Sequence, residues 1–177
     1  GFTTFCSASS PEEVVRQINR HLTIATEVIL AHGGTVHKFI GDGVMAVFGD
    51  PVPQEDHAVR AVAASLEIQE RMAKLRAGMA EGEWPMIVRI GLHTGELVAG
   101  DIGSESMLEY TVMGETVSVA SRLEGANKEL GTSILMSDAT ANLLGGIYSP
   151  RSLGKIEVRG LSEPLEVFTV GAPEEET

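Results

Sequence analysis

Residues 35–48 have the sequence TVHKFIGDGVMAVF, two β-prone runs on either side of a glycine-flanked aspartate. The runs 35–40 and 44–48 are short and rich in β-branched and aromatic residues, as is typical of paired strands. The loop Gly41-Asp42-Gly43 joins them, and its glycines tolerate the positive φ angles that tight hairpin turns require. The stretch therefore predicts a β-hairpin with a carboxylate at its tip.

A helix is predicted directly before this hairpin. Ser10 is suited to the N-cap, Pro11 to the first helical position and Glu13 to a capping box. Apolar residues then recur at spacings of three and four over 14–29, which is the pattern of an amphipathic helix. The glycine pair at 33–34 ends this pattern, so the helix is expected to stop there.

The rest of the chain alternates helical and β-prone segments. The expected elements are a helix over 55–79, a loop over 78–85, strands over 86–90 and 108–113 with short strands and turns between them, a helix over 115–128, a strand over 132–136, a short helix from 137, and strands over 155–158 and 165–170. Such alternation without an internal repeat favours an α/β or α+β sandwich, with helices covering a sheet. We expect one domain at 1–171 and an acidic flexible tail at 172–177.

The composition limits the classes of partner. Acidic residues outnumber basic ones by 25 to 13 and the formal charge is -12, so neither nucleic acid nor an anionic membrane is an expected partner. The single cysteine, Cys6, excludes an internal disulfide and a cysteine cluster for zinc, and it fits a reducing, cytoplasmic setting. No apolar run is long enough to span a bilayer, and no leader pattern opens the sequence. The five histidines show no metal-ligand spacing.

Four motifs occur in a consistent order along the chain. They are Gly1-Phe-Thr-Thr-Phe5, Lys38-Phe-Ile-Gly-Asp-Gly-Val-Met-Ala-Val-Phe48, Gly91-Leu-His-Thr-Gly-Glu-Leu-Val-Ala-Gly100 and Tyr110-Thr-Val-Met-Gly-Glu-Thr-Val-Ser-Val-Ala-Ser-Arg-Leu123, followed by Val158-Arg-Gly160 and Glu163-Pro164. Together they resemble the catalytic domain of the class III adenylate and guanylate cyclases, bacterial adenylate cyclases in particular. The resemblance implies the α+β class: a ferredoxin-like palm (βαββαβ) with helices over a mainly antiparallel sheet, plus a small C-terminal αβ extension.

The resemblance assigns roles to residues that would otherwise pass for ordinary ones. Asp42, by itself a typical turn former, matches the aspartate that holds Mg²⁺ or Mn²⁺, two ions per site in the intact protein. Lys38 and Thr111 match the pair that reads the purine, in which lysine donates to adenine N1 and threonine accepts from the exocyclic amine. Val112, beside Thr111, joins the substrate-binding residues. The pair favours ATP, since guanylyl cyclases usually present an acidic side chain where Lys38 stands.

A second set of residues matches groups that act on the ribose and phosphates. Arg122, otherwise an ordinary surface arginine, matches the one that stabilises charge on the α-phosphate during ring closure. Arg159 stands where the family often has a lysine for the terminal phosphates, and backbone amides around Phe2 and Thr3 match the loop that cradles them. Ser118 replaces the ribose-positioning asparagine and lacks its amide donors, so reduced turnover is expected.

The implied activity is that of an adenylate cyclase, which forms 3′,5′-cyclic AMP and pyrophosphate from ATP. In the family two domains pack head to tail. The resemblance implies that each site takes Asp42 and the phosphate loop from one subunit, and the purine-reading pair, Ser118 and Arg122 from the other. A homodimer is therefore expected. The family's other metal-binding aspartate belongs three residues before Gly1, on a first central strand missing from this sequence. We therefore expect an N-terminally truncated domain, with regulatory domains outside it.

Two other functions stay open on the sequence. A degenerate cyclase-homology domain would bind nucleotide or a partner with little turnover, as the serine at 118 and the unmatched metal aspartate suggest. A dimerisation module independent of nucleotide would leave Lys38, Asp42 and Arg122 as ordinary surface, and their joint occurrence in register argues against it.

Overall fold

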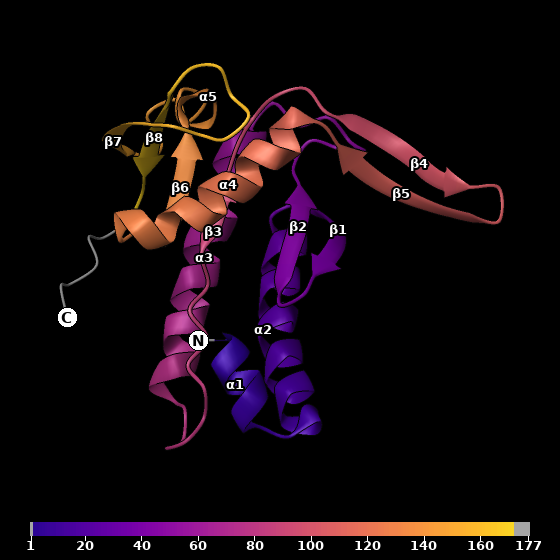
Figure 1. The fold of residues 1–177 in the computed structure, drawn as a ribbon. Helices are drawn as coiled ribbons and strands as arrows, with labels where there is room; N and C mark the ends of the chain where they lie inside the picture. The colour runs from indigo at the N-terminus through magenta and orange to yellow at the C-terminus, as the bar shows by residue number, and fades with distance from the viewer. Residues whose placement is uncertain (1, 172–177) are drawn as a thin grey trace.

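The computed structural model describes residues 2–171, which form an α+β protein (Figure 1). The elements in chain order are α1 (Phe2–Ala8), α2 (Pro11–Ala31), β1 (Thr35–Ile40), β2 (Gly43–Val47), α3 (His57–Ala77), β3 (Ile90–Leu92), β4 (Val98–Ser104), β5 (Met107–Met113), α4 (Glu115–Leu130), β6 (Ile134–Ser137), α5 (Asp138–Ala141), β7 (Arg151–Ile156) and β8 (Leu165–Thr169). The predicted acidic tail at 172–177 and the first residue, Gly1, lie outside the described residues. The predicted α+β class is confirmed.

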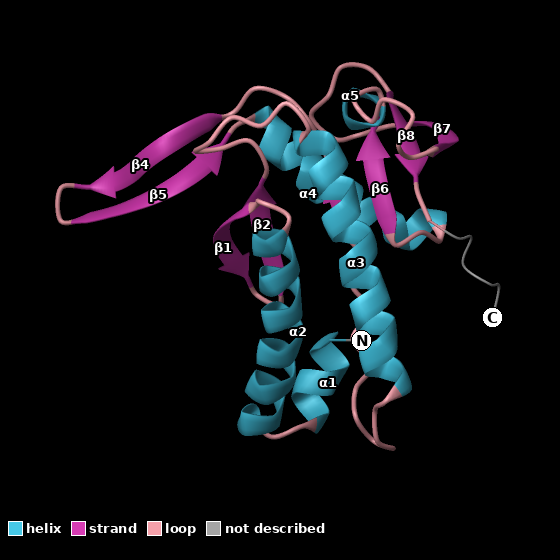
Figure 2. Cartoon of the chain, turned by 180° about the vertical axis from the view of Figure 1, so that it is seen from behind, coloured by secondary structure: helices cyan, strands magenta, loops and turns pink. Residues whose placement is uncertain are grey.

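The strands form three separate sheets. β1 and β2 make one antiparallel hairpin, β4 and β5 make another, and the other four strands form a sheet in the order β3-β6-β8-β7. In that sheet β3 and β6 are parallel, whereas the remaining pairs are antiparallel. α2 packs against α3 and the β1–β2 hairpin, while α4 packs against β3 and β6 (Figure 2).

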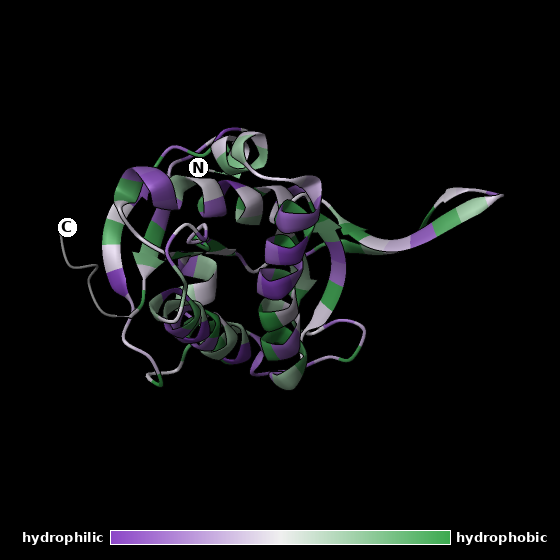
Figure 3. Ribbon diagram, turned by 90° about the horizontal axis from the view of Figure 1, so that it is seen from below, coloured by the Kyte–Doolittle hydropathy of each residue, from purple (hydrophilic) through white to green (hydrophobic). Residues whose placement is uncertain are grey.

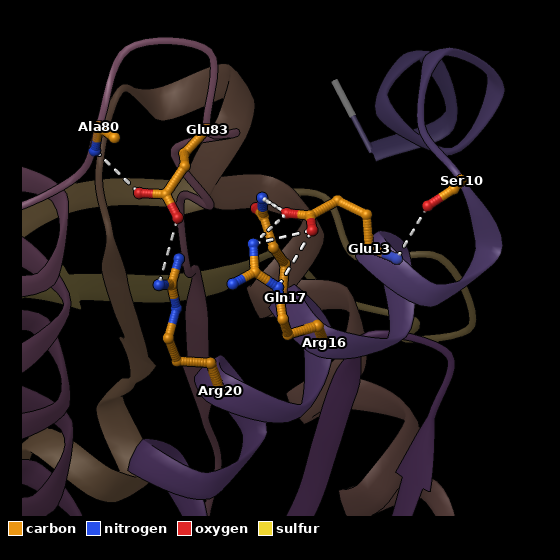
Figure 4. A network of polar contacts seen from close by, with 7 residues as sticks. All are labelled: Ser10, Glu13, Arg16, Gln17, Arg20, Ala80 and Glu83. Atoms are coloured by element: carbon orange, nitrogen blue, oxygen red, sulfur yellow. Dashed lines mark hydrogen bonds and ion pairs between the residues drawn. The ribbon is translucent and has the colours of Figure 1, made fainter.

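The start of α2 follows from its local sequence. The Oγ of Ser10 accepts a hydrogen bond from the Glu13 backbone N–H at 3.2 Å, and Pro11 is the first helical residue. The predicted capping box is only half formed, because the Glu13 carboxylate instead accepts from Arg16 at 2.8 Å and Gln17 at 2.6 Å (Figure 4). The Ser10 cap alone contributes about 1 kcal/mol to helix stability.

The hairpin predicted over 35–48 is present. Ile40 pairs with Gly43, so Gly41 and Asp42 form a two-residue turn. Gly41 has a φ of +59°, a conformation that glycine adopts without steric cost. The turn therefore places the Asp42 carboxylate at the hairpin tip, as the sequence indicates.

The first motif has a different local structure from the one predicted. Residues 2–8 form the helix α1, so Phe2 and Thr3 lie in its first turn, where backbone N–H groups have no partner within the helix. The helix packs by a long-range contact: the ring of Phe5 stacks on Trp84 with centroids 4.9 Å apart, and Phe2 approaches the same indole at 5.7 Å. Aromatic pairs of this kind stabilise a packed helix beyond its local propensity.

Two predicted strands are shifted. The strand expected over 86–90 begins only at Ile90, where β6 first provides a hydrogen-bonding partner. The strand expected over 155–158 is β7, which begins at residue 151 and contains an irregularity in its pairing with β8. Gly154 lies within that irregularity with a φ of +84°. In both cases pairing with a distant strand, rather than the local sequence, fixes the boundary.

Three clusters of buried apolar side chains hold the elements together. The first joins α2 to α3 around Val28 and Met72, the second joins α3 to the four-stranded sheet around Val62 and Met136, and the third joins α4 to that sheet around Leu123. Truncating a large buried side chain to alanine costs about 2–5 kcal/mol. The β1–β2 hairpin is therefore held to α2 and α3 through the first cluster, and the four-stranded sheet to α3 and α4 through the second and third.

A cavity of about 1230 Å³ lies between the β1–β2 hairpin and the four-stranded sheet. It is lined by β2, the segment 86–95, apolar residues of α2 and α3, and the first half of α4. Within residues 2–171, neither β2 nor β3 pairs with a strand on the side that faces this cavity. The cavity therefore has strand edges on two sides and an apolar wall of helices.

The β4–β5 hairpin projects from the body as an arm (Figure 3). Five of its large apolar side chains are exposed, namely Val98, Met107, Leu108, Tyr110 and Met113. The Met107 side chain, near the tip, is 79% exposed. Apolar residues gathered on a projecting element are typical of an interaction surface. Across residues 2–171, no helix combines the length and the apolar character needed to cross a bilayer.

Two histidines make the stability of the fold depend on pH. Burial lowers the pKa of His21 and of His93 below the ordinary value of 6.5. Below pH 6.5 the histidines of the unfolded chain therefore bind protons that the same histidines of the folded chain do not yet bind. The contribution of these neutral histidines to stability is complete above pH 6.5 and decreases as the pH falls toward the folded pKa values.

We expect the free energy of unfolding to decrease between about pH 7 and pH 5.5. In His21→Leu, the free energy of unfolding obtained from urea titrations should depend less steeply on pH. The slope should be smaller by up to about 1.4 kcal/mol per pH unit, since one proton no longer contributes. The difference between the two proteins isolates His21 from the other titrating groups. An identical slope in both would contradict the prediction.

Candidate active site

The cavity brings together five of the predicted site residues. Lys38, Asp42, Val112, Ser118 and Arg122 line it, whereas Thr111, Arg159, Phe2 and Thr3 do not. The five come from the β1–β2 hairpin, the end of β5 and the start of α4, three segments that are far apart in the sequence. A concave site with few convergent polar groups is the usual form of a small-molecule site.

Asp42 is half-buried at the hairpin turn and is close to other charges. Partial desolvation raises the pKa of the Glu124 carboxyl, the charge of Arg89 lowers it, and the charge of Asp42 raises it again. All three side chains line the cavity. They form a charged group on a wall that is otherwise largely apolar.

These carboxylates suit a cation that is shared with a ligand. Within residues 2–171 no three side chains of the His, Cys, Asp and Glu types are grouped to hold a metal ion. Mg²⁺ is usually bound in proteins by one or two carboxylates together with substrate phosphates and water, rather than by an all-protein cage. Asp42, whose charge raises the pKa of the Glu124 carboxyl, fits that arrangement.

Lys38 and Thr111 lie on strands that meet at the root of the arm. Lys38 is exposed on β1, and Thr111 lies on β5. The residues that precede them, His37 and Tyr110, stack with ring centroids 5.8 Å apart. The Thr111 Oγ is buried and has no hydrogen-bond partner among the described residues, while Val112 is 4% exposed. An unsatisfied buried hydroxyl costs about 1–3 kcal/mol.

The start of α4 carries Ser118 and Arg122 on one helical face. Gly114 precedes the helix with a φ of +132°, and its carbonyl accepts the Ser118 backbone N–H at 3.3 Å. Because Ser118 and Arg122 are four residues apart, they lie on the same side of the helix. Both are exposed and line the cavity. The exposed Arg122 guanidinium favours an anion there.

Arg122 also contacts the loop after β7. Its Nη1 lies 2.8 Å from the place that a Cβ on Gly160 would occupy, and Gly160 has a φ of +94°. The missing side chain at residue 160 therefore leaves room for the guanidinium. Arg159, the adjacent residue, is exposed and lies outside the cavity lining. The motifs at 110–123 and 158–160 thus meet in space.

Comparison with known proteins places this arrangement in a family. The family model described as the adenylate and guanylate cyclase catalytic domain matches residues 1–171. The chain belongs to this family. The family predicted from the four motifs is therefore confirmed.

The relatives and solved structures of this cyclase domain include enzymes named for either purine. The chain is 39% identical to Adenylate cyclase 1 of Rhizobium meliloti over 170 residues, which is 96% of the chain and 26% of that protein. It is 34% identical to Guanylate cyclase 2G of Rattus norvegicus over 97% of the chain and 16% of that protein. The structure matches the adenylyl cyclase CyaB from P. aeruginosa with a TM-score of 0.88 at 33% identity, covering 97% of the chain and 89% of the other. For the guanylyl cyclase Cya2 the TM-score is 0.84 at 33% identity, with coverage of 98% and 89%.

Sequence reasoning missed two charged residues that line the cavity, Arg89 and Glu124. Arg89 could have been found from the alternation around it, because Val88 and Ile90 pack into the first core cluster and the residue between them faces the other way. Glu124 comes two residues after Arg122 on α4, and only the fold reveals that Asp42 lies near it.

Proposed function

We propose that this cyclase domain is an adenylate cyclase that converts ATP to 3′,5′-cyclic AMP and pyrophosphate. The observation that carries the proposal is that a chain of this family has Lys38, Asp42 and Arg122, the groups needed for the base, the metal and the phosphate, so that two copies can supply a complete site. The identity of 39% to an adenylate cyclase supports the choice of ATP, although relatives named guanylate cyclase match at 34%. The purine assignment therefore rests on side-chain chemistry.

The chemistry of Lys38 favours adenine. A lysine ammonium can only donate hydrogen bonds, and adenine N1 is an acceptor, whereas guanine N1 carries a hydrogen. The unpartnered Thr111 hydroxyl can accept from the exocyclic amine of adenine. A site built to pair one purine edge leaves donors or acceptors unpaired with the other, which is a strong source of discrimination.

Ring closure requires little covalent chemistry from the protein. The ribose 3′-oxygen bonds to the α-phosphorus, the bond from that phosphorus to the bridging oxygen breaks, and the 3′-hydroxyl proton passes to water while pyrophosphate leaves. In the proposal Arg122 donates to the α-phosphate oxygens, and Arg159, with the backbone amides of Phe2 and Thr3, holds the terminal phosphates. Asp42 would hold Mg²⁺ or Mn²⁺, two ions per site, which neutralise phosphate charge and lower the pKa of the 3′-hydroxyl.

The proposal includes a homodimer that shares its sites between subunits. The exposed apolar residues of the β4–β5 arm support self-association, because burying side chains such as Met107 and Leu108 removes apolar surface from water. The chain spans about a quarter of Adenylate cyclase 1 and about a third of the Anabaena cylindrica adenylate cyclase. The activity and partners of the whole protein are part of the proposal.

The direct test supplies the full-length protein with ATP or GTP and Mn²⁺ and identifies the cyclic product by chromatography. We expect cyclic AMP, and we expect Lys38→Ala to reduce the preference for ATP. A preference for GTP in the wild type would refute the roles of Lys38 and Thr111. Nucleotide binding without any cyclic product would favour a degenerate domain that binds nucleotide with little turnover.

Ser118 favours that second candidate function, because its side chain is short and makes no strong contact. Its Oγ donates only to the Gly114 carbonyl of its own helix, at 3.5 Å. If an asparagine here positions the ribose, Ser118→Asn should raise kcat by about 10²-fold, the value of one well-placed donor in a transition state. The exposed position leaves room for the longer side chain.

The measurement is steady-state cyclic AMP formation by wild type and Ser118→Asn, with Ser121→Asn as the control on the same helix. Ser121 also lines the cavity and is exposed, but it is three residues further along α4. Equal or lower turnover in Ser118→Asn would show that the serine is not a defect of the site.

A further inference from the structure

A β-bulge interrupts the first strand next to the proposed purine-reading lysine. Val36 pairs with Ala46 and Lys38 pairs with Met45, so His37 is an extra residue without a partner in β2. A bulge re-aims the side chains around it and is often found beside active sites. Here it lets Lys38 line the cavity while the His37 side chain is buried elsewhere, with 1% of it exposed.

The buried His37 side chain lies between two residues from other segments. Its ring stacks on Tyr110 of β5, with centroids 5.8 Å apart and an interplanar angle of 23°. Its Nε2 is 3.9 Å from the Asp50 Oδ2, and that nitrogen has no hydrogen-bond partner among residues 2–171. His37 therefore touches both the arm and the segment that follows β2.

Asp50 closes this group of contacts. The Tyr110 hydroxyl donates to the Asp50 Oδ2 at 3.1 Å, and the Thr35 Oγ donates to the Asp50 carbonyl at 2.9 Å. The bond to Asp50 also raises the pKa of the Tyr110 hydroxyl, so the hydroxyl keeps the proton that it donates. One residue thus connects the start of β1, the end of the β1–β2 hairpin and the arm.

From these contacts we propose that His37, Asp50 and Tyr110 are positioning residues that fix β5 against β1 and thereby set the spacing between Lys38 and Thr111. The proposal rests on the proposed function, in which that pair reads the purine. Each member of the pair directly follows a member of the cluster, Lys38 after His37 and Thr111 after Tyr110. A shift of β5 relative to β1 would therefore change the distance between Lys38 and Thr111 directly.

The shape of the molecule makes such a fixing contact necessary. The strands of the arm pair with each other along their whole length and project from the body, so the body holds them only near their root (Figure 1). The Thr111 Oγ has no partner of its own among the described residues, so its place depends on the backbone of β5. Recognition of one purine edge by hydrogen bonds is lost when the donor and the acceptor move apart by a fraction of the hydrogen-bond distance.

The test compares Tyr110→Phe, which keeps the ring on His37 and removes the donor to Asp50, with the matched control Tyr148→Phe. Tyr148 packs in the second core cluster, away from the cavity lining. For each full-length variant, kcat and KM are measured with ATP and with GTP. We expect Tyr110→Phe to lower the ratio of kcat/KM for ATP over GTP about fivefold, the equivalent of one ordinary hydrogen bond. Asp50→Asn, whose amide oxygen can still accept, should retain most of the ratio.

A double variant separates positioning from a general loss of stability. If Tyr110 acts through the purine-reading pair, Tyr110→Phe should leave the ratio unchanged in a Lys38→Ala background, because there is no longer a paired contact to misalign. If Tyr110→Phe lowered the ratio of kcat/KM for ATP over GTP by the same factor with Lys38 present and in the Lys38→Ala background, the proposal would be overturned. It would also be overturned by a Tyr110→Phe protein that unfolds at a lower temperature but discriminates as well as Tyr148→Phe.

Equilibrium binding of ATP and GTP to the same variants keeps the two proposals apart. A wild type that binds both nucleotides but forms no cyclic product would count against the proposed activity alone. The ratio of the dissociation constants for ATP and GTP would still test whether Tyr110 positions the purine-reading pair. We expect Tyr110→Phe to change this ratio by about the same factor as the ratio of kcat/KM. An unchanged binding ratio would overturn it.

Discussion

Replacing Asp42 with alanine is expected to lower the turnover of ATP by about 10³-fold, the upper end of the cost of one transition-state contact. The carboxylate lies at a half-buried hairpin turn beside the cavity, with Glu124 near enough to feel its charge. Hard carboxylate oxygens are what Mg²⁺ and Mn²⁺ prefer, and phosphate chemistry in an acidic domain depends on added positive charge. Within residues 2–171 no group of three or more His, Cys, Asp or Glu side chains could hold a metal ion, so no other protein site is available to replace Asp42.

The measurement is the rate of cyclic AMP formation as a function of Mn²⁺ concentration, with Mn²⁺ binding followed separately by its magnetic resonance signal in the presence of ATP. Asp42→Asn keeps the size and the turn, so a similar loss there would assign the effect to charge. Asp56→Ala is the matched control, since that exposed carboxylate precedes α3, makes no cap hydrogen bond and pairs only with Arg60. Full activity in Asp42→Ala would eliminate the metal-binding role.

The parts of the structure that the sequence predicts well are those fixed by neighbouring residues. The α2 cap at Ser10 and the turn at Gly41 and Asp42 depend on side chains or φ angles within a few positions, so local chemistry decides them. The second half of the apolar stripe that predicts α2 lies in the first core cluster, through Ala25 and Ile29, whereas the buried residues in the first half of the helix are Gln17 and His21. Five of the residues named from the motifs line one cavity of the chain, although the motifs indicate their roles and not their arrangement.

The parts that the sequence does not predict depend on distant partners. The stacking of Phe5 on Trp84, which fixes α1 against the segment after α3, joins residues far apart in the sequence and leaves no local signal. The bulge at His37 is equally hidden, because a bulge is a property of the pairing between β1 and β2 and not of either strand. The proximity of Asp42 to Glu124 likewise appears only once α4 is folded back over the sheet.

Mixing two inactive proteins, Asp42→Ala and Arg122→Ala, is expected to restore about a quarter of the wild-type activity. If each site takes Asp42 from one subunit and Arg122 from the other, half of the randomly assorted dimers contain one chain of each kind. Such a dimer has one site with both residues intact and one site with neither. Half of the dimers are mixed and half of the sites in each mixed dimer are intact, which gives about a quarter of the wild-type activity. The activity is measured as cyclic AMP formed after co-expression, and purified mixed dimers should reach about half of the wild-type activity.

The structure makes this experiment informative, because it places Asp42 and Arg122 around the cavity of a single chain. If one chain supplied both residues to the same site, every site in the mixture would lack one of them, and the mixture would be as inactive as either parent. Recovery would therefore locate the site at the interface between subunits and give the exposed arm its function in pairing. Failure to recover, with mixed dimers demonstrated by two affinity tags, would place catalysis within one chain and leave self-association without a role in the chemistry.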